Sequence, residues 1–291
     1  MAITNFIPQL WAGGIMRELE RNQTWTQAGV VNRDYEGQIR QYGDTVLINS
    51  LGDVTIFDYT GILPEPEELT DTQRAMTIDQ QKAFNFKVDD IDAAQASENV
   101  MGEASRKAAR GLNEVAGRFV AGLALGADPA NVLGTADAPV TSIDKNNVFE
   151  FLVEMKRRLD DAGVPADGRW LQAPGWLEAL ILQADVINRV PSNQNNYIIN
   201  GVIGRVAGFN IITAPYTPEA TGTGGASDVI VAGHAMGISF AEQIIKTEAY
   251  RPEKSFADAL KGLHVYGGKL VRPEAVALAY ATGTGTTFAG L

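Results

Sequence analysis

The pattern of apolar and polar positions changes its period several times along the chain, and each change predicts a different kind of element. Apolar residues recur every three to four positions within 5–22, which predicts a short amphipathic helix. The polar stretch 23–43 is typical of an extended arm rather than a packed element. Two apolar runs in 44–61 and the alternation within 75–90 predict strands on either side of an acidic, proline-containing loop. Since an isolated two-stranded ribbon is only marginally stable, we expect this ribbon to be supported by another subunit.

The longest helix is predicted from about 93 to 126, where a period of three to four residues continues without interruption. The pairs Glu103–Lys107 and Glu114–Arg118 place the acid four residues before the base, which is the orientation that favours a helix. Asp128-Pro129 is expected to end the helix, because proline cannot continue it.

The second half alternates between helical and strand patterns, which predicts a mixed α/β region over about 140–245. In this half, one helix is predicted at 146–163, where Gly163 ends it, and a second helix is predicted at 175–186. A glycine-threonine loop is predicted at 218–228. The expected strands lie at 169–174, 201–217, 229–241, 261–270 and 275–281.

Composition narrows the class of protein. The chain has 291 residues with 45% hydrophobic and 20% charged residues, which is typical of a folded protein with one large or two modest domains. A net charge of −11 argues against sequence-specific nucleic-acid binding, because such a surface gains nothing from releasing phosphate counterions. The chain has no cysteine, no apolar run long enough for a membrane helix and no basic start of a secretory signal. We therefore expect assembly in a cytoplasm, without a membrane partner.

Candidate catalytic chemistry is sparse. The two histidines, His234 and His264, stand among apolar and glycine residues, so we interpret both as buried or partly buried structural residues. The glycines of 200–210 are followed by a strand, whereas a dinucleotide loop leads into a helix. We predict no enzyme activity, no cofactor and no metal site.

The clustered aspartates in "FNFKVDDIDAAQ" raise a separate question, because such carboxylates can bind a metal, share a proton or cap a helix. The strand alternation ends at Asp89, and the helical period begins at about Ala93. We predict that Asp90 or Asp92 caps the long helix, since a carboxylate there accepts hydrogen bonds from free N–H groups and suits the helix dipole.

Three segments carry a resemblance to a known family. They read "VVNRDYEGQIRQYGDTVLINSLGDVTIFDYT", "EELTDTQRAMTIDQQKAFNFKVDDIDAAQ" and "NGVIGRVAGFNIITAPYT", and they are similar to segments that recur in phage coat proteins. With the order of elements, they make nearly the whole chain resemble the major capsid protein of a tailed bacteriophage, which implies the α+β fold of the Hong Kong 97 type. The implied parts are an N-terminal arm at 1–35, an extended β-loop at 36–92, a peripheral domain at 93–139 and 246–283, an axial domain at 140–245, and a flexible tail at 284–291.

The same resemblance implies a structural role in the virion. Copies would assemble in the cytoplasm of the host bacterium as hexamers and pentamers of an icosahedral shell around double-stranded DNA, with a portal protein as partner and a decoration protein left open. The shell-like region begins almost at Met1, so a separate scaffolding protein is expected. An encapsulin-type cellular compartment and an unrecognised α/β enzyme are the alternatives. The expected intersubunit contacts lie in the apolar N-terminal stripe and the acidic loop: Trp11, Ile15, Glu65, Glu67, Glu68 and Asp71.

Overall fold

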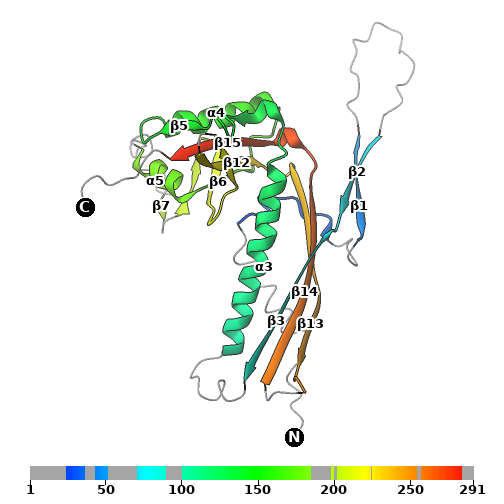
Figure 1. The fold of residues 1–291 in the computed structure, drawn as a ribbon. Helices are drawn as coiled ribbons and strands as arrows, with labels where there is room; N and C mark the ends of the chain where they lie inside the picture. Colours follow the sequence, from blue (N-terminus) through cyan, green and yellow to red (C-terminus); the bar gives the residue numbers. More distant parts are fainter. Residues whose placement is uncertain are drawn as a thin grey trace, which may run out of the picture.

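A computed structural model describes residues 24–36, 43–51, 71–89, 100–184, 198–199, 202–223, 225–253 and 257–283. Figure 1 shows an elongated body, formed by a long helix beside long strands, with a mixed α/β region at one end and a narrow ribbon along one side.

The elongated body consists of helix α3 (Val100–Ala124) and an antiparallel sheet in the order β13–β14–β3. The strands are β13 (Ile238–Tyr250), β14 (Ala257–Leu270) and β3 (Gln80–Asp89). With 25 residues, α3 is about 37 Å long. It packs on the sheet through apolar contacts such as the ring pair Phe119–Tyr266, whose centroids lie 5.5 Å apart. The predicted long helix is therefore present, and it ends four residues before Asp128. The predicted start at 93 lies outside the described residues.

The mixed region is built on an eight-stranded sheet with strand order β4–β15–β12–β6–β10–β9, to which β11 and β5 add at the sides. The central pairs β15–β12 and β12–β6 are antiparallel, whereas β6 and β10 run parallel, and β15 runs parallel to β4 and β5. The strands are β4 (Val132–Leu133), β5 (Val140–Ile143), β6 (Arg169–Ala173), β9 (Arg205–Val206), β10 (Phe209–Thr213), β11 (Glu219–Gly222), β12 (Gly225–His234) and β15 (Val276–Gly283). A separate two-stranded pair joins β7 (Ile198–Ile199) and β8 (Val202–Ile203).

Both faces of the eight-stranded sheet are covered. Helices α4 (Val148–Asp161) and α5 (Gly175–Gln183) pack on one face, where Ile230 and Ala232 of β12 point. The C-terminal half of α3 and residues 24–31 cover the other face, where Val229 and Val231 point. Because successive side chains of a strand point to opposite faces, β12 needs the continuous apolar run that its sequence has.

Two predictions about the strands are wrong, and the stretch 246–283 divides between two sheets. The stretch 229–241 is not one strand: it turns between His234 and Gly237, where the Gly237 N–H donates to the His234 carbonyl at 2.9 Å, and continues as β13 in another sheet. The stretch 218–228 contains β11 of a hairpin, which pairs with β12 although it has no apolar alternation. Finally, 246–283 do not all lie with the long helix, because β15 pairs with β12 in the mixed sheet.

The polar stretch after residue 23 is also not an arm over the described residues 24–36. Trp25, Val30 and Val31 are fully buried, and Asn32 forms a bridge with Ser239 of β13. Local sequence does not show this, because a few apolar residues among polar ones have no period, and their partners lie about 200 positions away.

The C-terminus of α4 follows its sequence signal. The N–H of Val164 donates to the Leu159 carbonyl, and the N–H of Gly163 donates to the Asp160 carbonyl, both at 3.0 Å. Gly163 has φ of 70°, which is the left-handed conformation that closes a helix in this way.

We predict that Gly163→Ala lowers the free energy of unfolding by about 1–2 kcal/mol, because an L-residue is strained at this φ. An added Cβ would meet nothing within 4 Å, so the strain is the only change. Gly175→Ala is the matched control, since Gly175 also has open space but no positive φ. Chemical denaturation of both variants measures the difference, and equal stability would contradict this account of the helix end.

A close approach joins α3 to the mixed region. A Cβ placed on Gly117 would lie 1.8 Å from the Tyr216 hydroxyl oxygen, so this glycine makes room for the tyrosine. Gly122, five residues further along the same helix, faces open space.

These two glycines predict opposite outcomes. Gly117→Ala should destabilise the protein by about 1–3 kcal/mol, since Tyr216 must leave its place. Gly122→Ala should stabilise it by up to about 1 kcal/mol, because alanine is the better helix former. Thermal or chemical unfolding of the two variants is the measurement, and a stable Gly117→Ala variant would show that the tyrosine does not depend on this contact.

Candidate assembly surfaces

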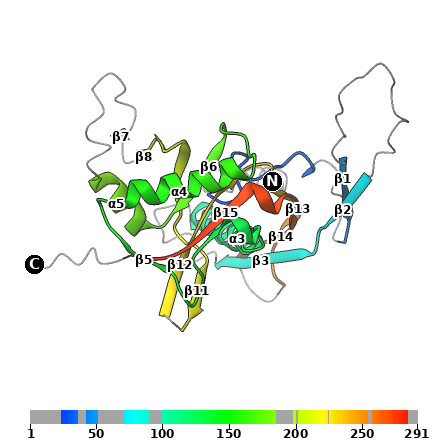
Figure 2. The ribbon, with the colours of Figure 1, turned by 90° about the horizontal axis from the view of Figure 1, so that it is seen from above.

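A two-stranded ribbon extends beside the long sheet (Figure 1). Strands β1 (Thr45–Leu51) and β2 (Asp71–Thr77) pair antiparallel in register from Thr45–Thr77 to Leu51–Asp71. Only two residues separate β2 from β3, so the ribbon joins the edge strand of the long sheet directly. Figures 1 and 2 show the ribbon beside the long sheet, away from α3.

One face of the ribbon is anchored to the body. Val46, Ile48 and Met76 are almost fully buried, and with Ile78 they pack against Ala241 and Val265 of the long sheet. Arg74 adds a polar contact, because its guanidinium donates to the Val271 carbonyl. This face holds the ribbon in place.

The opposite face has no cover within the described chain. Leu47 is 53% exposed, the highest value among the exposed large apolar side chains of the described residues. Its cross-strand partner Ala75 and the neighbouring pair Thr45–Thr77 are also exposed, and none of the four carries a charge. Both outer edges of the ribbon lack a strand partner among the described strands. An apolar, uncharged face with free strand edges is suited to contact another chain.

The predicted contact residues fall mostly outside the described structure. This holds for Trp11, Ile15, Glu65, Glu67 and Glu68, and also for the predicted helix caps Asp90 and Asp92. Asp71 is described by its backbone alone and lies at the far end of the ribbon, opposite Leu51. These assignments stay predictions, whereas Leu47 was not singled out from the sequence. Its signal was its place in the consecutive apolar run 46–48, because the side chains of a strand alternate between its two faces and Val46 and Ile48 turn inward.

Buried charges gather at the long sheet. Glu242 of β13 is 5% exposed and His264 of β14 is 1% exposed, and the Glu242 Oε2–His264 Nε2 distance is 3.1 Å. Arg33 completes the cluster, with its Nη2 2.5 Å from Glu242 Oε1. Burial lowers the pKa of Arg33, but the carboxylates of Glu242 and Glu36 outweigh it and raise the pKa, so this group stays charged. The cluster ties three segments together.

The two histidines have the structural environments that the sequence predicted. His264 is buried in this cluster, and its ring lies 5.1 Å from the Tyr266 ring. His234 is half-buried at the turn after β12, where its Nδ1 accepts a hydrogen bond from the Met236 N–H at 3.2 Å.

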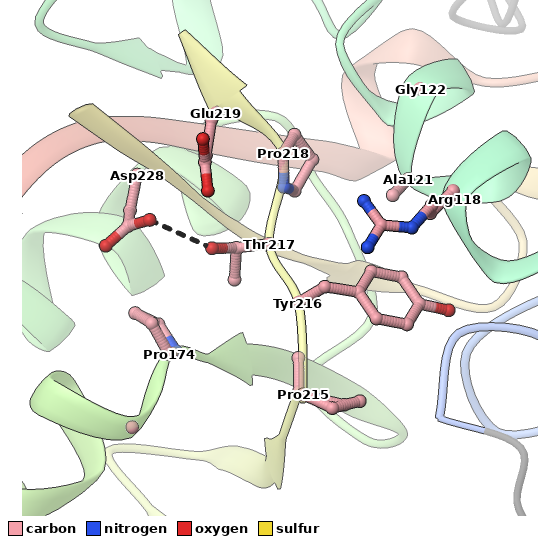
Figure 3. A pocket seen from close by; sticks show the side chains of 12 residues that line it. Arg118, Ala121, Gly122, Pro174, Pro215, Tyr216, Thr217, Pro218, Glu219 and Asp228 are labelled. Carbon is pink, nitrogen blue, oxygen red and sulfur yellow. Dashed lines mark hydrogen bonds between the residues drawn. The ribbon is translucent and has the colours of Figure 1, made fainter. Parts of the chain in front are cut away.

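A hollow of about 560 Å³ lies between α3, the start of α5 and the segment 214–219 (Figure 3). Two of its charged groups, Asp228 and Arg118, already have partners. Asp228 accepts hydrogen bonds from Trp176 Nε1 at 2.6 Å and from the Thr217 hydroxyl at 3.2 Å. Arg118 pairs with Glu114 at 2.9 Å and lies 4.9 Å from the centre of the Tyr216 ring.

The hollow has no catalytic arrangement. Burial and the Glu114 carboxylate raise the pKa of Tyr216 to about 12, so its hydroxyl stays protonated near neutral pH. The lining includes no histidine that could act as a base. Within the described residues, no group of three or more His, Asp or Glu side chains could hold a metal ion. No helix in the described part of the chain is long and apolar enough to cross a bilayer.

Comparisons with known proteins agree with a structural role. A family profile described as phage capsid protein matches residues 72–279. A solved chain of Mycobacterium phage Che8 is similar with a TM-score of 0.67 and 26% identity, over 95% of this chain and 98% of that one. The capsid of Ralstonia phage GP4 is similar with a TM-score of 0.68 and 10% identity, over 91% of both chains. A virus-like particle from Pyrococcus furiosus shares the fold with a TM-score of 0.56 and 12% identity, over 93% and 98%. No curated protein matches the chain.

The expected α+β fold of the Hong Kong 97 type is therefore confirmed, and with it the expected role as a shell protein located in the capsid of a virion. The matched region begins in β2 of the ribbon and ends in β15 of the mixed sheet. It therefore includes α3, the long sheet and the strands of the mixed sheet that precede β15. The chain belongs to the phage capsid protein family, as a structural shell protein of the tailed-phage major capsid type.

Proposed function

We propose that this chain assembles as hexamers and pentamers into an icosahedral shell around packaged double-stranded DNA. The observation that carries the proposal is the ribbon, because its exposed face of Thr45, Leu47, Ala75 and Thr77 lacks both charge and cover in the described chain. A neighbouring copy would cover that face and pair with its free edges. The acidic loop residues Glu65, Glu67, Glu68 and Asp71 would contact that copy next to the ribbon, and Trp11 and Ile15 would make a second contact.

The net charge of −11 supports a shell protein that does not bind the packaged DNA tightly. A strongly basic chain would bind DNA phosphates with high affinity, which would hinder packaging and release. In this proposal, assembly takes place in the cytoplasm of the host bacterium, with a separate scaffolding protein, a portal protein at one vertex and no catalytic step by this chain. A decoration protein is an additional partner of the outer surface in the same proposal.

A cellular compartment of the encapsulin type is the alternative function. The observation that favours it is the shared fold with the virus-like particle from Pyrococcus furiosus, which covers 93% of this chain. The two functions require the same shell and differ in what the shell encloses.

The ribbon predicts a specific assembly defect. Leu47→Asp should prevent particle formation, because a carboxylate buried against a neighbouring copy lacks a partner, while the isolated subunit keeps its fold since the residue is exposed. Val153→Asp is the matched control, because Val153 is 43% exposed on α4, away from the ribbon. Electron microscopy counts particles, and circular dichroism checks the subunit. If Leu47→Asp forms particles as readily as the parent chain, the ribbon face is not an assembly contact.

The contents of the particle separate the two functions. Particles recovered from cells that carry the neighbouring genes should contain double-stranded DNA that resists added nuclease. Empty particles made without the packaging genes serve as the control, and their DNA content should fall to background. If the particles enclose protein cargo and no protected DNA, the chain forms a cellular compartment of the encapsulin type and not a phage capsid.

A further inference from the structure

Three connections lead between the elongated body and the mixed region, and all three meet at one point. They are 125–131 between α3 and β4, 235–237 between β12 and β13, and 271–275 between β14 and β15. Asn131 Nδ2 donates to the Glu274 carbonyl at 2.7 Å, and the Val271 N–H donates to the Gly237 carbonyl at 2.8 Å. Because the covalent links are short and gathered together, they form a hinge, and the angle between the two bodies is held by other contacts, one of which is the packing of α3 on the mixed sheet.

A further contact between the two bodies begins on the mixed sheet and ends on β13 next to this hinge, and it is not a direct covalent link between the bodies. Residues 24–33, called the strap below, cross from the mixed sheet over α3 to the long sheet. At its first end, the Thr24 carbonyl accepts a hydrogen bond from Gln172 Nε2 of β6 at 2.9 Å. Trp25 donates from Nε1 to the Tyr216 carbonyl at 3.2 Å, and its ring meets the Trp170 ring edge-on at 6.3 Å. These contacts hold the strap to the mixed region.

The middle of the strap packs against α3. The hydroxyl of Thr26 lies 3.4 Å from Asn113 Oδ1, and both residues are buried. Trp25, Val30 and Val31 are fully buried in the apolar cluster that also contains α3 residues and mixed-sheet residues. The strap therefore occupies the space between the two bodies.

The last end of the strap is anchored on β13. The Asn32 N–H donates to the Ile238 carbonyl at 2.8 Å, and the Phe240 N–H donates to the Asn32 carbonyl at 2.9 Å. Arg33 donates from Nη1 to the Thr26 carbonyl at 3.0 Å while Nη2 pairs with buried Glu242. Glu242 is also in contact with His264, so one carboxylate joins the strap to β13 and β14 of the long sheet.

We propose that the strap is a conformational brace, which acts together with the packing of α3 on the mixed sheet to fix the angle between the mixed sheet and the elongated body, and that the Arg33–Glu242 pair is its releasable anchor. Rotation about the hinge requires the strap to slide off α3 or to leave β13. Loss of the anchor charge leaves the Glu242 carboxylate buried with one partner fewer, and breaking such a buried pair is strongly unfavourable. The brace is a property of the single subunit and does not depend on the proposed shell.

The test compares the same distance in the full chain with the anchor intact and broken. The chain has no cysteine, so Lys107→Cys on α3 and Glu150→Cys on α4 give two unique and exposed positions for spin labels. Arg33→Gln breaks the anchor. Arg157→Gln is the matched control, because Arg157 also pairs with two carboxylates, Glu154 and Asp161, but on the exposed face of α4. Hydrogen exchange of the Phe240 amide is measured on the same variants without labels.

Arg33→Gln should broaden the distribution of label distances and raise the exchange rate of the Phe240 amide at least about tenfold. Arg157→Gln should change neither quantity. Faster exchange of the Phe240 amide with an unchanged distribution of label distances would overturn the proposal, because Arg33 would then stabilise only the local contact between the strap and β13. No change in either quantity would overturn it as well. If Arg33→Gln does not fold, Glu242→Gln, which keeps the size of the side chain and one acceptor oxygen and removes the charge, decides by the same two measurements.

Discussion

The subunit depends on the apolar contact between one face of the mixed sheet and the C-terminal half of α3. Alanines of the helix, such as Ala116 and Ala124, let its backbone come close to the sheet, where Val231 and Leu278 fill the space. Each fully buried Val or Leu side chain contributes about 1.5–3 kcal/mol, so this one cluster supplies much of the energy that holds the two bodies together. Helices α4 and α5 cover the other face of the sheet. Packing on that face does not set the direction of the long helix, because the cluster there contains no described residue of α3.

The buried charges support this arrangement and do not form a reactive centre. Arg169 is 2% exposed, and it donates to the carbonyls of Val164 and Pro165 while pairing with Asp160 at 2.7 Å. Glu242 plays the corresponding role in the long sheet. Burial of such groups is tolerated because they are paired, and a change of partner would be costly, which favours one arrangement of the segments over others. A shell protein needs one well-defined arrangement of its segments, since each copy must present the same surfaces.

Elements with a long or complete pattern could be predicted from the sequence. Helix α4 was expected at 146–163 and lies at Val148–Asp161, since its period and Gly163 are both local signals. Strands β6 and β14 were also recognised. The mistakes have one cause. The stretch 229–241 is apolar throughout because both of its strands are buried, so periodicity could not show the turn at Met236 or the change of sheet. Strand β11 had the opposite difficulty, since Glu219 and Thr221 are exposed and the alternating Ala220 and Gly222 are too small to give a clear apolar period.

The sequence by itself determined the class of this protein: a cysteine-free acidic chain with a long helix, strands around it, a mixed α/β region and no catalytic motif, together with a resemblance to phage capsid proteins that the comparisons confirmed. Periodicity and composition are local or additive properties, so one chain is enough to read them. Only the tertiary structure decided that residues 24–33 are packed, that Glu242 joins Arg33 and His264, and that Leu47 faces outward from the ribbon while its neighbours face inward. These facts depend on contacts between residues up to about 200 positions apart, and no local pattern carries information about which distant side chain will fill a given space.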